Sequence, residues 1–302
     1  MSNPARMLLF LTAITGLLAC VYAADKPAAP DAAPAKDPAK TSINLRLLDA
    51  EDKAGATAIG QPGGAAVLKI TRGYEKGDQI VVIGTSHMFV RLDEAMPEAL
   101  VYCPDGVLQF PIPFGADAKA FPPLTVAAHT VSARVATRDD LAKYRNLALN
   151  PVDVSAAGEA FPHATANSVC RGEPVFAARN AIDGSVDADG HGDWPHQSWG
   201  PDQKDDLVWR VDFGRTVEID KVVVALRAHV GHDKFWKGAT LVLSDGTKKA
   251  VTFEPNGNPR TFALPATKVT WVELRDFTWP EPRGWCAITE VEVWGRDVEP
   301  KP

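Results

Sequence analysis

The sequence contains little cysteine, little tyrosine and almost no helical periodicity. It has no CxxC and no HExxH pattern, which removes the common zinc motifs. It also lacks GxSxG, a Walker loop and a cysteine with a histidine partner in a motif, which argues against the familiar nucleophilic hydrolases and nucleotide-binding enzymes. The net charge is −6 without a basic aromatic stripe, so nucleic acid and anionic membrane surfaces are not expected partners.

The chain begins with an export pattern. Arg6 precedes an apolar run over residues 7–18, and Val21 and Ala23 have the spacing of a signal-peptidase site. We therefore expect residues 1–23 to be a signal peptide and the protein to be periplasmic, cell-surface or extracellular. An uncleaved membrane anchor is an alternative. A second alternative is that "GLLAC" resembles a bacterial lipoprotein box, with a lipid on Cys20 as the only membrane attachment.

Residues 24–42 are an Ala/Pro/Lys/Asp repeat that has too little apolar surface to offset the entropy of ordering. We therefore expect these residues to form a disordered tether. The remaining length, about 260 residues, is enough for two domains with separate cores.

Short β-rich runs separated by turns fill residues 43–136 and predict an antiparallel β-sandwich. Thr137 followed by Asp140 predicts a capping box on a short helical linker, residues 137–145. Longer strands follow in residues 146–297, before a tail at 298–302. In "DDLVWRVDFG", apolar residues alternate with polar ones, as in a strand with one buried face. We expect an all-β protein of two sandwiches.

The motifs "NLALNP", "NAIDG", "WRVDFGRTVEIDKVVV", "ATLVLSDGT" and "ITEVEVWG" occur in one order over residues 146–296. As an ordered set they resemble discoidin domains, which include the coagulation factor 5/8 type C-like domains and the family thirty-two carbohydrate-binding modules. "FPHATANS" and "HGDWPHQSWG" are more similar to bacterial two-domain carbohydrate-binding proteins. The resemblance implies a galactose-binding-like jelly roll for residues 146–297.

The same resemblance implies a structural calcium ion on the loop after "NAIDG". Its expected ligands are a carbonyl of Asn180 or Ala181, the side chain of Asp183, an oxygen of Asp187 or Asp189, and Glu290 from the last strand. Oxygen ligands of this kind suit a hard cation. The alternative is that these acids are solvated turn residues. An EF-hand is excluded because Ser198 stands where the bidentate glutamate belongs.

A glycan site needs an aromatic face and a few fixed polar groups. The loops of the second half supply such groups, and the candidate ligand-binding residues are His191, Trp194, His196, Arg227, His229, His232, Trp236 and Trp285. Arg227 is equally compatible with an internal salt bridge, because a charge at an apolar strand end needs a partner. Trp199, Trp209 and Trp271 are expected in the core.

The sequence thus favours an exported, non-catalytic carbohydrate-binding protein, with a glycan or polysaccharide as partner. Two alternatives stay open: a cell-envelope adhesion protein that binds proteins through the same loops, and a glycan-cleaving enzyme. No catalytic residue is assigned, because a flexible acidic loop does not hold two carboxyls rigidly.

Zinc ligation by His191 with His196, or by His229 with His232, is a further alternative, although the spacing is inconclusive. The resemblance to coagulation-factor domains also implies a disulfide between Cys170 and Cys286, with Cys103 left unpaired.

Overall fold

The structure is a computed structural model that describes residues 37–124, 129–154, 160–187, 189–229 and 231–298. The signal peptide, the lipoprotein box and most of the tether and tail predicted from the sequence lie outside these ranges. Within the last residues of the predicted tether, Pro38–Lys40 form a short 3-10 turn (η1). No helix among the described residues has the length and apolar character needed to cross a membrane.

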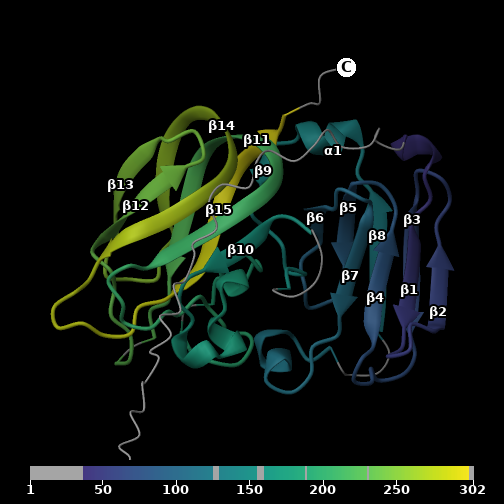
Figure 1. Cartoon of the computed structure of the whole chain (residues 1–302), viewed down its shortest axis with the longest axis horizontal. Coiled ribbons are helices and arrows are strands. Elements are labelled where there is room, and N and C mark those ends of the chain that lie inside the picture. The colour runs from purple at the N-terminus through teal and green to yellow at the C-terminus, as the bar shows by residue number, and fades with distance from the viewer. Residues whose placement is uncertain (1–36, 125–128, 155–159, 188, 230, 299–302) are drawn as a thin grey trace, which may run out of the picture. The chain divides into compact units, whose positions relative to one another are not determined.

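Eight strands form two antiparallel four-stranded sheets in the first part of the chain (Figure 1). One sheet has the order β2-β1-β4-β7 and the other β3-β8-β5-β6. The strands are β1 Asn44–Leu48, β2 Ala54–Ile59, β3 Ala65–Ile70, β4 Gln79–Ile83, β5 His87–Arg91, β6 Ala99–Tyr102, β7 Val107–Pro111 and β8 His129–Val135. Their alternating side chains enclose one core, which includes Leu45, Ile80 and Phe110.

The β-rich runs predicted over residues 43–136 form strands β1 and β3–β8, but the sequence did not indicate β2. Its residues, "AGATAI", carry little apolar area, and none of them is buried. β2 pairs only with β1 and forms the edge of its sheet, where no second strand selects for bulky side chains.

The predicted capping box is also confirmed. In helix α1, Arg138–Ala142, the Thr137 hydroxyl accepts from the Asp140 amide at 3.1 Å, and the Asp140 carboxylate accepts from the Thr137 amide. Arg134 donates to the same carboxylate at 2.8 Å. Burial raises the pKa of Asp140, but these hydrogen bonds outweigh it and hold the pKa well below its usual value.

The second half forms one antiparallel sheet with long bent strands, in the order β13-β12-β14-β11-β15-β9, with β10 paired to β11. The elements are β9 Arg145–Asn146, β10 His163–Ala166, β11 Val208–Leu226, β12 Gly238–Leu243, β13 Lys248–Thr252, β14 Arg260–Thr278 and β15 Ile288–Asp297. Register breaks interrupt the pairing of β11 with β14 between Asp212 and Val217. Such breaks bend strands, so that long strands can wrap one core as a sandwich.

Gly214 lies within this register break of β11. Its φ is +64°, a conformation that favours glycine, and a Cβ there would collide with the ring of Phe161. The bend therefore depends on the absence of a side chain at this position.

The core of the second sandwich follows the predicted alternation. Trp209, Val211 and Phe213 of β11 are fully buried, and Trp199 joins them. Trp271 is different from the expectation: it is only partly buried, and the Arg210 guanidinium lies 4.3 Å from its ring centroid. Trp271 faces outward because it pairs with Asp212, which belongs to the outer face of β11.

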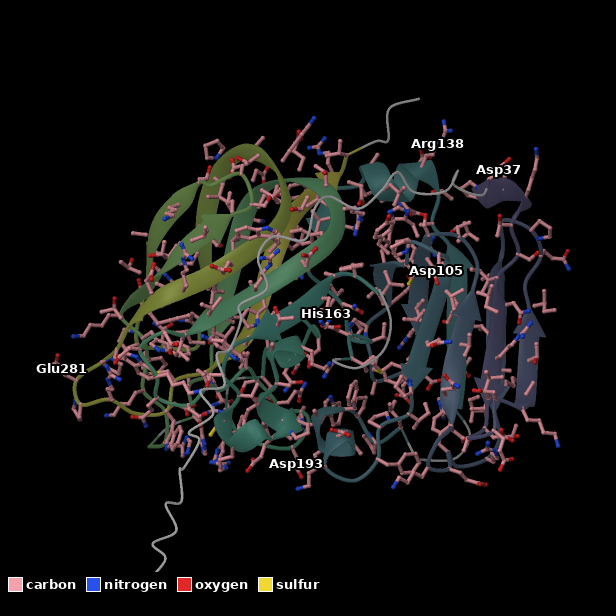
Figure 2. All side chains as sticks on the ribbon, viewed as in Figure 1. Asp37, Asp105, Arg138, His163, Asp193 and Glu281 are labelled. Atoms are coloured by element: carbon pink, nitrogen blue, oxygen red, sulfur yellow. The ribbon has the colours of Figure 1, made fainter. Side chains whose placement is uncertain are left out.

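Four short 3-10 turns complete the fold: η2 Asp117–Ala120, η3 Cys170–Gly172, η4 Pro174–Phe176 and η5 Ala178–Ala181. Cys170, Val175 and Phe176 are packed in the core of the first sandwich, although the chain places them in the second half. Ahead of them, His163 of β10 (labelled in Figure 2) binds the buried Asp153 at 2.6 Å. Because Cys170, Val175 and Phe176 belong to the predicted second domain but pack in the first core, the two predicted domains share packing.

Candidate functional site at the loop rim

Three loops of the second sandwich are joined by backbone hydrogen bonds where β11 ends and β15 begins. Arg227 N donates to the Ala287 carbonyl at 3.0 Å, and Lys234 N donates to the Trp285 carbonyl at 2.8 Å. Trp199 and Ile288 exchange hydrogen bonds in an isolated bridge. These contacts bring together residues that are nearly 90 positions apart in the chain, and we call this region the loop rim.

The loop rim contains a cavity of about 110 Å³. The residues that line it are Cys170, Arg171, Phe176, His191, Gly200, Pro201, Arg227, His232, Trp285 and Cys286. Trp285 is 39% exposed, one of the few large hydrophobic residues that face solvent. The cavity thus combines an exposed indole, two imidazoles and two guanidinium groups.

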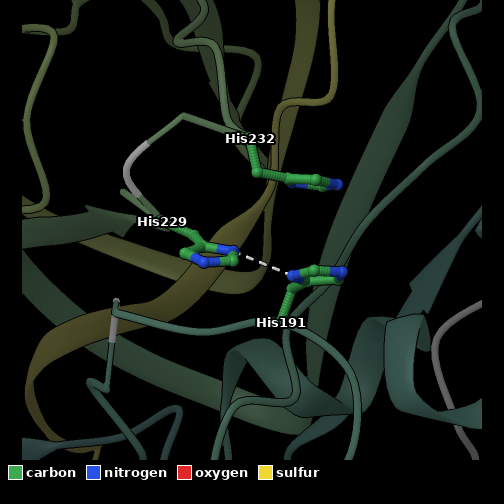
Figure 3. A group of neighbouring side chains, drawn as sticks. All are labelled: His191, His229 and His232. Atoms are coloured by element: carbon green, nitrogen blue, oxygen red, sulfur yellow. Dashed lines mark hydrogen bonds between the residues drawn. The ribbon is translucent and has the colours of Figure 1, made fainter.

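Three histidines lie close together (Figure 3), and two of them, His191 and His232, line this cavity. His191 Nδ1 lies 2.9 Å from His229 Nδ1, and the His191 and His232 rings stack with centroids 4.1 Å apart. Burial lowers the pKa of His191, and the positive charges that His232, Arg227 and His229 carry when protonated lower it further. This electrostatic environment favours a neutral imidazole at His191.

A buried ion pair supports the histidines from beneath. Arg227 donates to both carboxylate oxygens of Asp233, at 2.9 and 2.8 Å, and the two side chains are 4% and 0% exposed. Asp233 also accepts from the His229 amide at 2.9 Å and lies 2.8 Å from His232 Nδ1. Burial raises the pKa of Asp233, but the bonds from Arg227 and His232 outweigh it and lower the pKa.

Comparison with known proteins identifies the second half. Residues 163–291 match the family model of the F5/8 type C domain. Residues 163–291 are an F5/8 type C domain. This result and the observed sheets confirm the predicted discoidin-like sandwich. No curated protein matches the chain.

Several solved structures are similar to part of the chain. Chitosan-binding module 1 of a chitosanase/glucanase from Paenibacillus sp. IK-5 is 22% identical, covers 51% of this chain and all of that one, and has a TM-score of 0.37. The family 32 carbohydrate-binding module of C. perfringens NanJ, in complex with galactose, is 18% identical over 43% of this chain and 91% of its own, with a TM-score of 0.34. A Streptococcus pneumoniae fucose-binding module is 16% identical over 52% and 99%, with a TM-score of 0.37.

The F5/8 type C domain brings together only part of the predicted ligand-binding set. His191, Arg227, His232 and Trp285 line the cavity, and His229 adjoins it. Arg227 forms the internal salt bridge that was one of its two alternatives, with Asp233 as the partner, and it also lines the cavity. It therefore holds the site together from below.

Trp236, Trp194 and His196 lie elsewhere. The expectation that Trp236 faces a ligand is wrong: it is 1% exposed and packs against Trp199 and Phe277. Trp194 lines a separate cavity of about 190 Å³ that also contains Asp183 and residues of the first sandwich. His196 lies 3.1 Å from the Asp187 carboxylate.

The cysteine prediction is also corrected. Cys103, Cys170 and Cys286 are all free and buried, so the implied Cys170–Cys286 disulfide is not formed. Cys170 and Cys286 instead line the loop-rim cavity. Burial raises the pKa of the Cys286 thiol to about 12, which keeps it protonated and unreactive.

The residues expected to bind calcium lie at two separate places in the structure. Asp183 and Glu290 are both buried, and each accepts a backbone amide of the same turn: Ser185 N at 2.9 Å and Gly184 N at 3.1 Å. Asn180 and Ala181 lie in the adjoining turn η5, where the Asn180 side chain bonds to Arg179 and to the Pro174 carbonyl. Within the described ranges, Asp187 and Asp189 do not join Asp183 and Glu290 in one group of carboxylates.

The Asp183–Glu290 pair has an unusual electrostatic environment. Burial raises the pKa of Asp183 to about 6. The pKa of Glu290 is raised well above its usual value, mainly by burial and secondly by the nearby charge of Asp183. The buried Arg179 lies 3.9 Å from Asp183 and compensates only part of this charge. The amide oxygen of Gln197, whose nitrogen donates to Asp183 at 2.8 Å, is buried without a hydrogen-bond partner among the described residues.

Sequence reasoning missed Asp233, Phe176 and Arg171. Asp233 had a usable signal, because a buried arginine at the end of a strand requires an acidic partner nearby. Phe176 and Arg171 gave none, since their place in the cavity depends on η3 and η4 packing beside the loop rim.

Proposed function

We propose that this is an exported, non-catalytic carbohydrate-binding protein that holds a glycan in the loop-rim cavity of its F5/8 type C domain. The observation that carries the proposal is the exposed Trp285 beside His191 and His232 in one cavity. An indole face suits the apolar C–H surface of a sugar ring, and imidazole nitrogens suit its hydroxyls. The arrangement is concave and fixed from below by the buried Arg227–Asp233 pair, as a preformed binding site requires.

The residues that line this cavity also support a binding role over catalysis. Glycoside hydrolysis requires two carboxyl groups that flank the scissile bond. The residues that line the cavity include neither aspartate nor glutamate, and Asp233 is committed to Arg227. The cavity likewise favours a glycan over the adhesion alternative, for which a broad flat apolar patch would be the expected surface.

The test is intrinsic tryptophan fluorescence of the protein titrated with galactose, other monosaccharides and polysaccharide fragments. We expect a saturable change in the millimolar to micromolar range, equivalent to about 4–8 kcal/mol. Trp285→Ala is expected to weaken binding about 10-fold or more, since it removes the aromatic face. Trp271→Ala is the matched control, because Trp271 lies on the outer face of β14 and packs under Arg210. Unchanged binding in Trp285→Ala, or no saturable signal with any sugar, would favour the protein-adhesion alternative.

A structural calcium ion beside Asp183 and Glu290 is part of the proposal. Burial raises the pKa of both carboxyls, because only Arg179 lies near enough to offset their charge, and Gln197 adds a neutral oxygen without a partner among the described residues. Carboxylate and amide oxygens are the ligands that calcium prefers. The ion would neutralise the pair and fix the turn at Gly184 to β15.

This environment predicts an inverted pH dependence. When the pKa of a carboxyl is raised in the folded state, the protein becomes less stable as the pH rises from the unfolded-state pKa to the folded-state pKa. The free energy of unfolding should therefore fall between pH 3.8 and about 6 because of Asp183, and further because of Glu290. In chelator both carboxyls should contribute to this loss, and calcium should abolish it. Urea denaturation at several pH values, with chelator and with calcium, measures both.

Asp183→Asn and Glu290→Gln variants provide the control for this pH dependence. Each removes one ionisable group at constant size, so the decline should shrink and the response to calcium should be lost. A stability that is independent of pH in chelator, or equal in both conditions, would remove calcium from the proposal.

Export through the N-terminal apolar run, with cleavage after Ala23 or lipidation of Cys20, completes the proposed function. A glycan-binding protein needs access to glycans outside the cytoplasm. Mass spectrometry of the protein from the membrane and soluble fractions would distinguish the two routes by the N-terminal residue and its mass.

A further inference from the structure

The three histidines at the loop rim share a feature that glycan binding does not require. His191, His229 and His232 each offer a ring nitrogen, and these three atoms lie within 4.8 Å of one another (Figure 3). His191 comes from the loop before β11, while His229 and His232 come from the loop after it. Within the described ranges this is the one group of three or more histidine, cysteine or acidic residues so arranged.

His232 is already oriented as a metal ligand. Its Nδ1 lies 2.8 Å from the fully buried carboxylate of Asp233, which can only accept a hydrogen bond. The proton of His232 is therefore on Nδ1, and the lone pair of Nε2 is free. A carboxylate behind the imidazole is the usual means of fixing the tautomer and direction of a metal-bound histidine.

The Asp233 carboxylate is itself held rigidly. Arg227 binds both of its oxygens, and the amide of His229 donates to it at 2.9 Å. One buried carboxylate thus connects the backbone of the second histidine with the ring of the third. The support behind the cluster is rigid, while the imidazoles themselves reach solvent.

The remaining pair supplies the other two nitrogens. His191 and His229 contact each other through Nδ1 at 2.9 Å, so one ring donates a proton to the lone pair of the other. Two imidazoles that already point nitrogens at each other can exchange this hydrogen bond for bonds to a common cation. His191 is exposed, so its ring can turn toward a cation by giving up its stacking on His232 and its hydrogen bond to His229.

We propose that His191, His229 and His232 bind a divalent transition-metal ion of the zinc class. Zinc–nitrogen bonds of about 2.0–2.1 Å place tetrahedral ligands about 3.3 Å apart, so the nitrogens must approach one another, and the stacked rings of His191 and His232 must unstack before both can point at one ion. Imidazole ligands select zinc, copper or nickel over calcium and magnesium. Three protein ligands leave a fourth position open, and beside the loop-rim cavity that position is accessible to water or to an oxygen of a bound molecule.

The zinc site shares His191 and His232 with the proposed glycan site, but the proposed function does not depend on it, because a sugar can be held by Trp285 and neutral imidazoles without a metal. The test is isothermal titration of the metal-stripped protein with zinc chloride, supported by the visible absorption of bound cobalt. We expect one equivalent of zinc with micromolar affinity or tighter, and a cobalt spectrum of tetrahedral type.

The variants are His191→Ala and His232→Ala. Loss of a carboxylate behind a zinc-bound histidine costs about 10–100-fold in affinity, and loss of a ligand should cost at least 100-fold. His196→Ala is the matched control, since His196 is a partly exposed loop histidine that pairs with Asp187 outside the cluster. Circular dichroism and the melting temperature without metal verify that each variant is folded.

Three results would overturn the metal site: no zinc uptake by the wild-type protein at millimolar concentration, wild-type affinity in His191→Ala and His232→Ala, or an equal loss in His196→Ala. Sugar titration in chelator separates this outcome from the proposed function. A glycan signal without zinc uptake would support the glycan site and overturn the metal site. Zinc uptake without a glycan signal would support the metal site and overturn the glycan site.

Discussion

Arg227→Ala is expected to destabilise the F5/8 type C domain by about 3–5 kcal/mol, because it leaves Asp233 charged, buried and without its main partner. The Asp233 side chain is 0% exposed, and it organises the loop through the amide of His229 and the ring of His232. The measurement is the change in the urea midpoint of the transition assigned to this domain, at an unchanged m value.

The exposed pair between Arg283 and Asp205 is the matched control for Arg227. These side chains are 42% and 80% exposed, so Arg283→Ala should cost at most about 1 kcal/mol. Arg227→Ala should also weaken sugar binding, but only through disorder of the loop. A fully stable Arg227→Ala variant without sugar binding would contradict the scaffolding role and return Arg227 to direct ligand contact.

Trp236→Ala is expected to cost about 3–5 kcal/mol, the usual loss for removing a buried tryptophan. Trp236 lies in a cluster with Trp199 and Phe277, with ring centroids 5.8 and 4.6 Å away, and Trp279 contacts it from the rim side. Truncation leaves a cavity under the loops that carry the site. Thermal unfolding followed by circular dichroism measures the loss.

Two comparisons make the Trp236 result specific. Trp236→Phe should cost far less, because it keeps an aromatic ring and removes an indole N–H that has no hydrogen-bond partner in the described part of the chain. Trp285→Ala, at a 39% exposed position, should leave the melting temperature nearly unchanged while it weakens sugar binding. If Trp236→Ala were as stable as Trp285→Ala, the assignment of one indole to the core and the other to the rim would be wrong.

Strand positions could be predicted where one face of a strand is buried. In β11 the alternation of Trp209, Val211 and Phe213 with polar residues is a local consequence of strand geometry, and the structure confirms it. The capping box of Thr137 and Asp140 is likewise local, since both partners lie within one turn. β2 escaped prediction because an edge strand of alanine and glycine carries no hydrophobic pattern.

The site could be predicted only in part. A segment rich in histidine, aspartate and tryptophan indicates a loop with ligand-type side chains, and His191, His232 and Trp285 do meet at one cavity. Which indole is exposed cannot be predicted in this way, because Trp236 and Trp285 both lie in irregular segments where no period separates inside from outside. For Arg227 an acidic partner could be expected nearby, but only the structure shows that this partner is Asp233 in the following loop.

The sequence by itself determined the strands with a buried face, the capping of α1 and the family of the second sandwich, because these depend on periodicity and on ordered motifs along the chain. Only the tertiary structure decided that Asp233 connects Arg227 to His232, that Cys170 and Cys286 stay apart as thiols, and that three histidines converge. Those contacts join residues brought together by the pairing of β11 with β15 and by the hydrogen bonds between loops. Long-range pairing sets such distances, and no local pattern encodes them.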